Sequence, residues 1–157
     1  MSEQEFDEIS NLETEAWIAF DNDQYDRAIE LASKAIELAP HSARSYYIRA
    51  NAAESLRRYE DALKDIDAAI KLEQNARYYL VKATVSESLN RLDEAIVSMT
   101  NAISISDDEF YIISRAIYYK KHNLIDLALL DLGRIKKTSP YNALAETVAG
   151  SITKPIE

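Results

Sequence analysis

The hydrophobic and polar positions of the chain follow a helical period over most of its length. In YDRAIELASKAIELAP, residues 25–40, apolar residues recur at intervals of three and four, and a proline follows the last of them. This spacing predicts an amphipathic helix that ends before Pro40. Similar stretches begin at Tyr59, Leu92 and Ile125, offset in turn by 34, 33 and 33 residues. A fixed period of this size predicts an array of similar helical units.

Residues at equivalent places in the four copies, here called columns, show where the helices of each unit touch. Two columns contain only alanine, and large apolar residues precede them. Antiparallel helices approach closely only where small residues face each other, so each copy is predicted to be a helical hairpin. One hairpin cannot bury its apolar face alone, and the copies are therefore expected to stack. The alanine columns are Ala16, Ala50, Ala83 and Ala116, and Ala28, Ala62, Ala95 and Ala128.

The apolar spacing predicts two helices in each copy and one more after the last copy. Asn90 and Asn123 fall in the predicted turns, where asparagine tolerates a positive φ. The last helix carries Leu144, Val148 and Ile152 on a narrow apolar stripe, which suits either a cap on the last copy or a movable segment. The predicted helices cover residues 5–21, 25–38, 43–57, 59–72, 76–89, 93–105, 109–121, 125–138 and 143–152.

The second copy in particular resembles a known family. SARSYYIRANAAESLRRYEDALKDIDAAIKL, residues 42–72, is similar to the tetratricopeptide repeat pattern nearly throughout. This resemblance implies an all-α fold, an α-solenoid of four tetratricopeptide-like helical hairpins plus a C-terminal capping helix. It also implies one domain over residues 1–157, with repeats at 9–42, 43–75, 76–108 and 109–142 and the capping helix at 143–152.

The chain departs from the family pattern in three ways. The glycine usual in the turn inside each repeat is absent, and the fourth copy has Gly133 within its predicted second helix. A column that is aliphatic in the family is charged in all four copies here. We expect the stems of these side chains to pack while their charges reach water. The column consists of Glu15, Arg49, Lys82 and Arg115.

In this family the first helices of successive repeats line a concave surface, and the resemblance implies a partner-binding set there. The middle of that surface is apolar, as protein interaction sites tend to be. Arg44 and Arg77 occupy one column and Glu54 and Glu87 another, which predicts a basic row and an acidic row that orient a bound peptide. Some members could instead pack between repeats. The set is Trp17, Phe20, Arg44, Tyr47, Ile48, Asn51, Glu54, Arg77, Leu80, Val81, Thr84, Glu87, Phe110, Ile113 and Ile117.

A specialised branch of the family grips the C-terminal carboxylate of chaperones with Lys, Asn, Asn, Lys and Arg at five concave positions. One match in five in either register does not make such a clamp, so we expect no carboxylate capture. The two possible registers place Glu13, Trp17, Ile48, Arg77 and Val81, or Tyr47, Asn51, Val81, Phe110 and Ser114, at those positions.

Composition and charge limit the classes of ligand and site that the protein can have. The 157 residues carry a net charge of −9, which disfavours nucleic acid and anionic membrane surfaces. Cysteine is absent, so disulfides and thiolate metal sites are excluded. No basic-then-apolar leader and no long apolar run occur, and we expect a cytoplasmic protein without membrane insertion, either complete or part of a longer chain.

No catalytic, cofactor-binding or metal-binding residues are predicted. His41 and His122 fall in separate turns, and the chain has no glycine cluster for phosphates. We therefore expect a protein–protein interaction module or scaffold that binds a peptide or helix of a partner protein, and not an enzyme. The alternative is a structural protein that forms homo-oligomers through its apolar surface or its open end.

Overall fold

The fold consists of helices alone over residues 3–153, which is the range that the computed structural model describes. The predicted helix bounds agree with the observed ones within two residues, except at the end of the eighth helix. The helices are α1 (Glu3–Asp21), α2 (Tyr25–Leu38), α3 (Ala43–Ser55), α4 (Tyr59–Leu72), α5 (Ala76–Ser88), α6 (Leu92–Ile105), α7 (Glu109–Lys121), α8 (Ile125–Leu132) and α9 (Asn142–Thr153).

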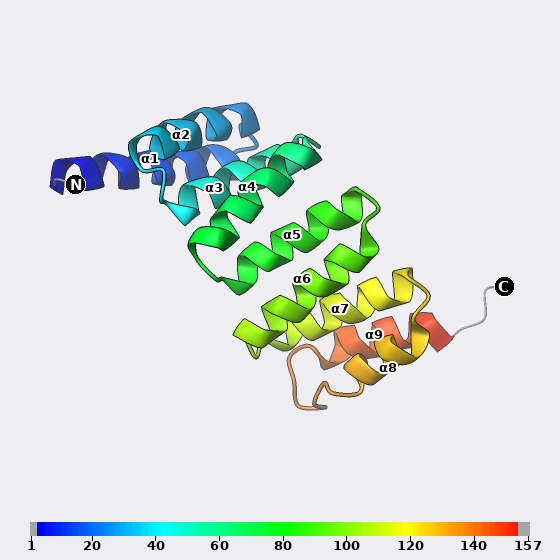
Figure 1. Cartoon of the computed structure of the whole chain (residues 1–157). Coiled ribbons are helices and arrows are strands. Elements are labelled where there is room, and N and C mark those ends of the chain that lie inside the picture. Colours follow the sequence, from blue (N-terminus) through cyan, green and yellow to red (C-terminus); the bar gives the residue numbers. More distant parts are fainter. Residues whose placement is uncertain (1–2, 154–157) are drawn as a thin grey trace.

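Consecutive helices pair into hairpins, and the hairpins stack in chain order (Figure 1). The pairs α1–α2, α3–α4, α5–α6 and α7–α8 each touch along their length, and the second helix of each pair also packs against the first helix of the next. Helix α9 packs on α7 and α8 at the far end of the stack. The predicted α-solenoid of four hairpins with a C-terminal capping helix is confirmed.

The alanine columns lie where the helices cross. All eight alanines of the two columns have no exposed surface. A larger side chain at any of these positions would push the helices apart, because protein interiors are packed nearly as densely as organic crystals. The period in the sequence therefore sets the spacing of the helices.

The turns inside the hairpins share one backbone conformation. Their residues have φ values between 58° and 60°, although none of them is glycine. The predicted positive φ at Asn90 and Asn123 is confirmed, and asparagine and aspartate adopt it most readily among non-glycine residues. Arg57 adopts it too, at φ 58°, with no such advantage. The four residues are Asp23, Arg57, Asn90 and Asn123.

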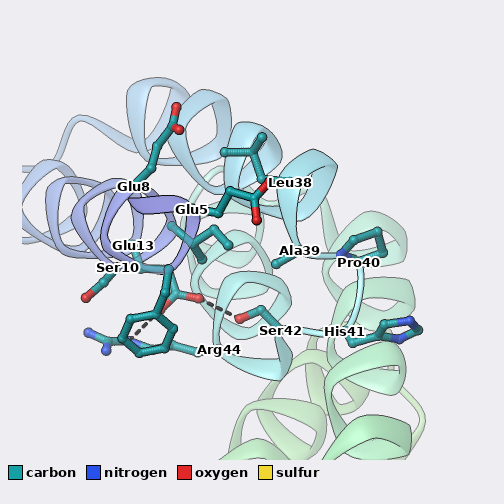
Figure 2. A pocket seen from close by; sticks show the side chains of 12 residues that line it. Glu5, Glu8, Ser10, Glu13, Leu38, Ala39, Pro40, His41, Ser42 and Arg44 are labelled. Carbon is teal, nitrogen blue, oxygen red and sulfur yellow. Dashed lines mark hydrogen bonds and ion pairs between the residues drawn. The ribbon is translucent and has the colours of Figure 1, made fainter. Parts of the chain in front are cut away.

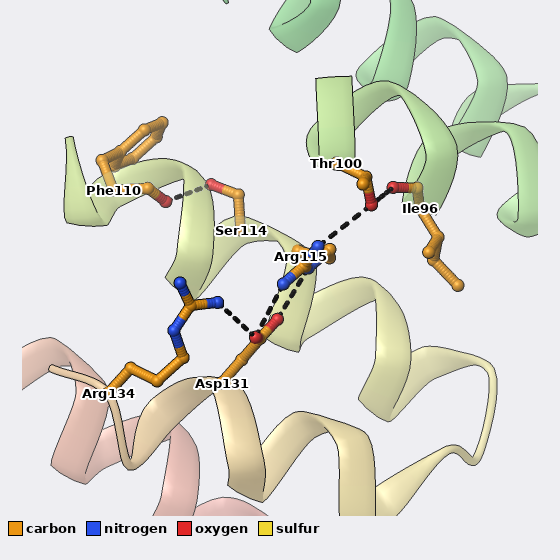
Figure 3. A network of polar contacts seen from close by, with 7 residues as sticks. All are labelled: Ile96, Thr100, Phe110, Ser114, Arg115, Asp131 and Arg134. Carbon is orange, nitrogen blue, oxygen red and sulfur yellow. Dashed lines mark hydrogen bonds and ion pairs between the residues drawn. The ribbon is translucent and has the colours of Figure 1, made fainter. Parts of the chain in front are cut away.

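Two arginines of the charged column do not extend to water as expected. Nε of Arg49 donates to Oδ2 of Asp65 at 2.7 Å, and Nη2 donates to Oδ1 at 2.8 Å. Arg115 and Asp131 form the same pair two copies later (Figure 3). Both aspartates are buried, so each ion pair joins the two helices of one hairpin from the inside. The expectation fails because a carboxylate stands opposite each arginine on the second helix and accepts two charge-assisted hydrogen bonds that would otherwise go to water.

Each of these arginines also reaches the hairpin before it. Nη1 of Arg49 donates to Oγ of Ser33 at 3.0 Å, and Nη1 of Arg115 donates to Oγ1 of Thr100 at 3.1 Å. Ser33 and Thr100 belong to one column, whose member in the last copy is Gly133. The charged column thus links neighbouring repeats as well as the two helices of one repeat.

Helix α8 ends at Leu132, six residues before the predicted end at residue 138. The amide of Gly133 still donates to the carbonyl of Leu129, but Arg134 and Ile135 donate three residues back, which tightens the last turn. Glycine weakens a helix because its backbone loses more freedom on ordering. Ile135 is nevertheless buried with α7 and α9, so the segment after the helix still contributes to the core.

Helix α9 continues the register of the first helices. It begins at Asn142, 33 residues after the start of α7 at Glu109, and places Ala149 in the first alanine column. Ala145 and Val148 are buried against α7 and α8. α9 therefore closes the last hairpin and does not fold into the concave face.

Candidate functional site

The first helices lie on the inner side of the stack. α1 contacts α3, α3 contacts α5, and α7 contacts α9, whereas α5 with α7, and the second helices with one another, make at most marginal contact. Elements that approach one another closely lie on the inside of a curve, and those that spread apart lie on the outside. The face formed by α1, α3, α5 and α7 is accordingly the concave face, as the resemblance implies.

Aromatic side chains run across this face through three hairpins. Phe20 meets Trp17 edge-to-face with ring centroids 5.4 Å apart, and Trp17 lies 5.6 Å from Tyr47. Tyr47 in turn lies 4.8 Å from Tyr78 on α5. We call Phe20, Trp17, Tyr47 and Tyr78 the aromatic series. The first three are half-buried, and they offer ring surface to a ligand at a fixed spacing.

Tyr78 is the member that sequence reasoning missed. It is buried, and burial with the negative charge of Glu73 raises its pKa to about 12. Its hydroxyl donates to a carboxylate oxygen of Glu73 at 3.3 Å. A signal was present in the sequence, since Tyr78 and Tyr111 form a column beside the large apolar one.

Three residues of the predicted partner-binding set are in the core. Ile48 and Ile113 expose 0% and 1% of their surface, and Val81 is also buried. They lie on the side of each first helix that packs against neighbouring helices, so no partner can reach them in this conformation. The alternative reading, packing between repeats, describes these three. Leu80, Phe110 and Ile117 are half-buried and remain available together with the aromatic series.

The polar members of the set hydrogen-bond to their own helices. Nδ2 of Asn51 donates to the carbonyl of Tyr47 at 2.7 Å, and Oγ1 of Thr84 donates to that of Val81 at 2.9 Å. Both side chains are half-buried. The carboxamide oxygen of Asn51 can still accept a hydrogen bond from a ligand.

In the predicted basic row, Arg44 is already engaged. Its guanidinium lies 3.5 Å from the carboxylate of Glu13, which is buried and accepts hydrogen bonds from Ser42 and Ser45 at 2.5 and 2.6 Å (Figure 2). Arg77 is exposed, and no carboxylate between residues 3 and 153 pairs with it. Burial raises the pKa of Tyr47 beside it, and the Asn51 hydrogen bond and the charge of Arg77 oppose that rise.

The predicted acidic row divides in the same way. The carboxylate of Glu87 pairs with the ammonium group of Lys121 on α7. Glu54 has no ion pair with any residue that the structure describes, and its burial raises its pKa. Each row therefore contributes one charge without an internal partner, Arg77 and Glu54, and these two are the ones that a ligand can use.

The half-buried rings and the unpaired charges of this face suit the binding of a ligand. Over residues 3–153 no group of three or more His, Asp and Glu side chains is placed to hold a metal ion. His122 lies 2.8 Å from Asp93, away from the aromatic series in sequence and on another hairpin. None of the helices in this range is both long and apolar enough to cross a membrane.

Two curated proteins share part of the sequence. The chain is 41% identical over 64 residues to a protein SGT1 homolog from Oryza sativa subsp. japonica, across 41% of this chain and 17% of that protein. It is 32% identical over 74 residues to Hsc70-interacting protein 1 from Drosophila melanogaster, across 47% of this chain and 20% of that protein. The similar stretch thus spans a fifth or less of either relative.

Solved structures resemble most of the array. MamA is 26% identical with a TM-score of 0.74, over 78% of this chain and 73% of that chain. YrrB, described as a tetratricopeptide repeat protein with an unusual peptide-binding site, is 21% identical with a TM-score of 0.73, over 87% and 72% of the two chains. The first tetratricopeptide domain of Spaghetti, solved with an HSP90 peptide, is 20% identical with a TM-score of 0.66, over 79% and 94%.

The sequence itself matches a family model directly. The match to the tetratricopeptide repeat model covers residues 14–73 and 50–99, which together are more than half of the chain. The matched range contains the complete second hairpin, with both of its alanine-column residues. The protein belongs to the tetratricopeptide repeat family.

Proposed function

We propose that the protein is an interaction module whose concave face holds an extended or helical segment of a partner protein. The observation that supports this most strongly is the aromatic series, whose three half-buried rings lie on the inner face of the first two hairpins and continue to the buried ring of Tyr78 on the third. Aromatic anchors in such positions often supply most of the binding energy of an interface. The half-buried Leu80 and Ile117 extend the aromatic series toward the C-terminal hairpins, and we call the series together with these two residues the apolar strip.

The free charges give the bound segment a direction. Arg77 would donate hydrogen bonds to a carboxylate or to a helix C-terminus of the partner. Glu54 would accept a hydrogen bond from a basic side chain or an amide of the partner. Because both charges stand beside the apolar strip, they favour one orientation of the ligand over its reverse. The partner is not held by its C-terminal carboxylate in this proposal, because Arg77 is the only cation among the nine residues at the clamp positions of the two registers.

The relatives support a role in protein binding without identifying the partner. One curated relative is named for an interaction with Hsc70, and one similar structure holds an HSP90 peptide. These properties belong to those proteins. For the present chain they make a peptide or a protein segment the proposed ligand class.

The test is affinity capture from native cells, with variants at the anchors. Tyr47→Ala plus Leu80→Ala should lose the specific partner, whereas Val97→Ala plus Leu130→Ala should retain it, because the latter pair is exposed on the second helices. Circular dichroism establishes that each variant is folded. Retention of every partner by the Tyr47/Leu80 variant would contradict the proposal.

Self-association is the second candidate, and the exposed face of α8 supports it. Leu127 and Leu130 are 42% and 66% exposed, and Val97 on α6 is 58% exposed. The first two copies have charged residues at these places, so the outer face becomes apolar only toward the C-terminal end. The Leu127 column otherwise holds Arg27, Asp61 and Glu94, and the Leu130 column holds Glu30, Lys64 and Val97.

Light scattering across the micromolar range distinguishes this candidate from the first. A dimer that Leu127→Glu plus Leu130→Glu converts to a monomer would support self-association through α8. A wild-type protein that stays monomeric would remove it, and the concave-face proposal would be unaffected.

A further inference from the structure

The N-terminal end of the stack has a pocket to which no residue of the aromatic series contributes. A cavity of about 670 Å³ lies between the first turns of α1 and the segment that joins α2 to α3 (Figure 2). Phe6, Ile9, Leu38 and Pro40 form its apolar lining. Phe6 and Leu38 expose 58% and 50% of their surface, so two large apolar walls face solvent here.

This pocket exists because α1 is longer than the other first helices. α1 has 19 residues, whereas α3, α5 and α7 have 13 each. In the repeat register, residues 3–8 come before the place where the later first helices begin, which is about one and a half additional turns. Phe6 lies on this extension, so no other hairpin in the array has an equivalent wall.

The pocket is also at the acidic end of the molecule. Residues 1–42 contain 11 of the 27 acidic residues and two of the 18 basic ones, so their formal charge of −9 equals that of the whole chain. Glu5 and Glu8 line the pocket. Arg44 also lines it, but its charge is directed to the buried carboxylate of Glu13. The opening therefore combines apolar walls with a negative potential.

We infer that this N-terminal pocket is a second interaction site, which binds a short basic amphipathic segment of a partner protein. One bulky apolar side chain of that segment would insert between Phe6 and Leu38, and Lys or Arg side chains would lie over Glu5 and Glu8. Charge complementarity selects this ligand, since an acidic segment, a nucleic acid or an anionic membrane would be repelled. The site is separate from the aromatic series, so both can be occupied together.

The test uses the full chain and a fluorescein-labelled synthetic peptide built from repeated Lys-Leu-Leu-Lys units, followed by fluorescence anisotropy. Binding should saturate and should weaken between about 50 and about 300 mM NaCl, because exposed charges are screened over that range. Phe6→Ser plus Leu38→Ser should weaken binding roughly tenfold or more, because two apolar contacts are lost. Glu5→Gln plus Glu8→Gln should weaken it as well and should flatten the salt dependence.

Matched variants separate this site from general charge attraction and from the concave face. Val97→Ser plus Leu130→Ser removes two exposed apolar side chains elsewhere, and Glu60→Gln plus Asp61→Asn removes two exposed charges from α4. Both should bind the peptide like the wild type, and so should Tyr47→Ala plus Leu80→Ala. Circular dichroism of each variant confirms that it is folded.

Three results would overturn the inference. They are unchanged binding by the Phe6/Leu38 variant, an equal loss in the Glu60/Asp61 variant, and loss only in the Tyr47/Leu80 variant. The last result would place the peptide on the concave face and would leave the proposed function intact. If the protein formed a dimer that only the Phe6/Leu38 substitution dissociated, the occupant of the pocket would be a second copy of this chain and not a basic segment of a partner.

Discussion

Arg115 is bound to Asp131 in the same way that Arg49 is bound to Asp65, with distances of 2.7 Å to one carboxylate oxygen and 2.8 Å to the other in both pairs. The second and fourth hairpins are thus each joined by one buried bidentate ion pair. The first hairpin has Glu15 and Leu31 at these places, and the third has Lys82 and Ser98. The array therefore contains its own comparison of hairpins with and without this ion pair.

Removal of one partner of the Arg49–Asp65 ion pair should lower the free energy of unfolding strongly, whereas replacement of both partners by apolar residues should lower it little. Arg49→Met should lower the free energy of unfolding by about 3 kcal/mol, because it leaves a buried carboxylate without a counter-charge. Arg49→Met plus Asp65→Leu should recover most of that loss, since leucine already occupies the equivalent position in the first hairpin. Urea unfolding measures both effects. Arg27→Met, at an exposed pair with Glu30, is the control and should change stability far less, because solvent screens this pair; an equal cost at both sites would refute the argument.

Ser86 is a position where a small substitution should stabilise the protein. It is fully buried on α5, and its hydroxyl has no hydrogen-bond partner among the described residues. The first two copies have Ala19 and Ala53 in this column. Ser86→Ala should raise the free energy of unfolding by about 1 kcal/mol, because it removes an unsatisfied buried polar group. Ser98→Ala is the control, because the Ser98 hydroxyl donates to the carbonyl of Glu94. A loss of stability in Ser86→Ala would show that the hydroxyl is satisfied.

Arg57 is the turn residue least suited to its backbone. It has a φ of 58° in a conformation that glycine adopts without steric cost. Arg57→Gly should therefore raise the free energy of unfolding by about 0.5–1 kcal/mol, after the greater freedom of glycine in the unfolded chain is subtracted. Asn90→Gly, at φ 59°, should give a smaller change, since asparagine tolerates this region. Thermal unfolding of the two variants side by side measures the difference, and a larger gain at Asn90 would contradict the explanation.

The buried hydroxyl of Tyr78 predicts that the protein loses stability at alkaline pH. Burial, with the charge of Glu73, raises its pKa from 10.0 in the unfolded chain to about 12 in the fold. The stability that this group contributes is complete below pH 10 and is lost as the pH rises toward 12, because the unfolded chain releases the proton first. Tyr78→Phe should reduce the fall in unfolding free energy between pH 9 and pH 11, measured by urea titration. Tyr79→Phe, which removes a neighbouring hydroxyl bonded to Gln74, is the control. An unchanged alkaline slope in Tyr78→Phe would disprove this assignment.

Glu54 should show a conflict between stability and binding. Burial raises its pKa, so its charged form is disfavoured in the folded protein and lowers stability at neutral pH. Glu54→Gln should therefore increase the unfolding free energy at pH 7, and the gain should shrink as the pH falls toward 4.5 and vanish below it, because both states are then protonated. The same variant should bind the partner of the concave face more weakly. Glu60→Gln, at an exposed position in the first turn of α4, should leave binding unchanged and should lower stability slightly, because it removes a charge that complements the helix dipole; a Glu54→Gln protein that is less stable at pH 7 would contradict the argument.

The period of the sequence was sufficient to predict the fold, because the alanines that repeat are the residues at which the helices cross. The ion pairs were not predicted, although Arg49 and Asp65 stand 16 residues apart, as do Arg115 and Asp131. The family pattern led us to treat each arginine alone and not together with the residue opposite it. The end of α8 was misplaced because apolar spacing continues to Ile135, while Gly133 stops the helix before it.

The candidate site was predicted less completely than the fold. A column identifies the helix to which a residue belongs. Which side of that helix packs against its neighbours and which side faces solvent depends on how far each hairpin is rotated against the next. Ile48 and Ile113 therefore appeared equivalent to Tyr47 and Leu80, and the structure separates them by burial. The pocket beside Phe6 lies outside the repeat, so comparison of columns could not reveal it.

The continuous register from α1 to α9 makes the molecule adjustable in length. The junctions between hairpins follow one register, although Arg49 and Arg115 bridge two of them and Lys82 bridges the other. A second copy of residues 76–108 inserted after residue 108 would therefore have a second helix before it and a first helix after it, as the original has. Such a chain would gain a further segment of inner surface and leave both ends as they are. The surface that contacts a ligand could thus be lengthened by one repeat at a time, while the N-terminal pocket and the terminal helix α9 stay unchanged.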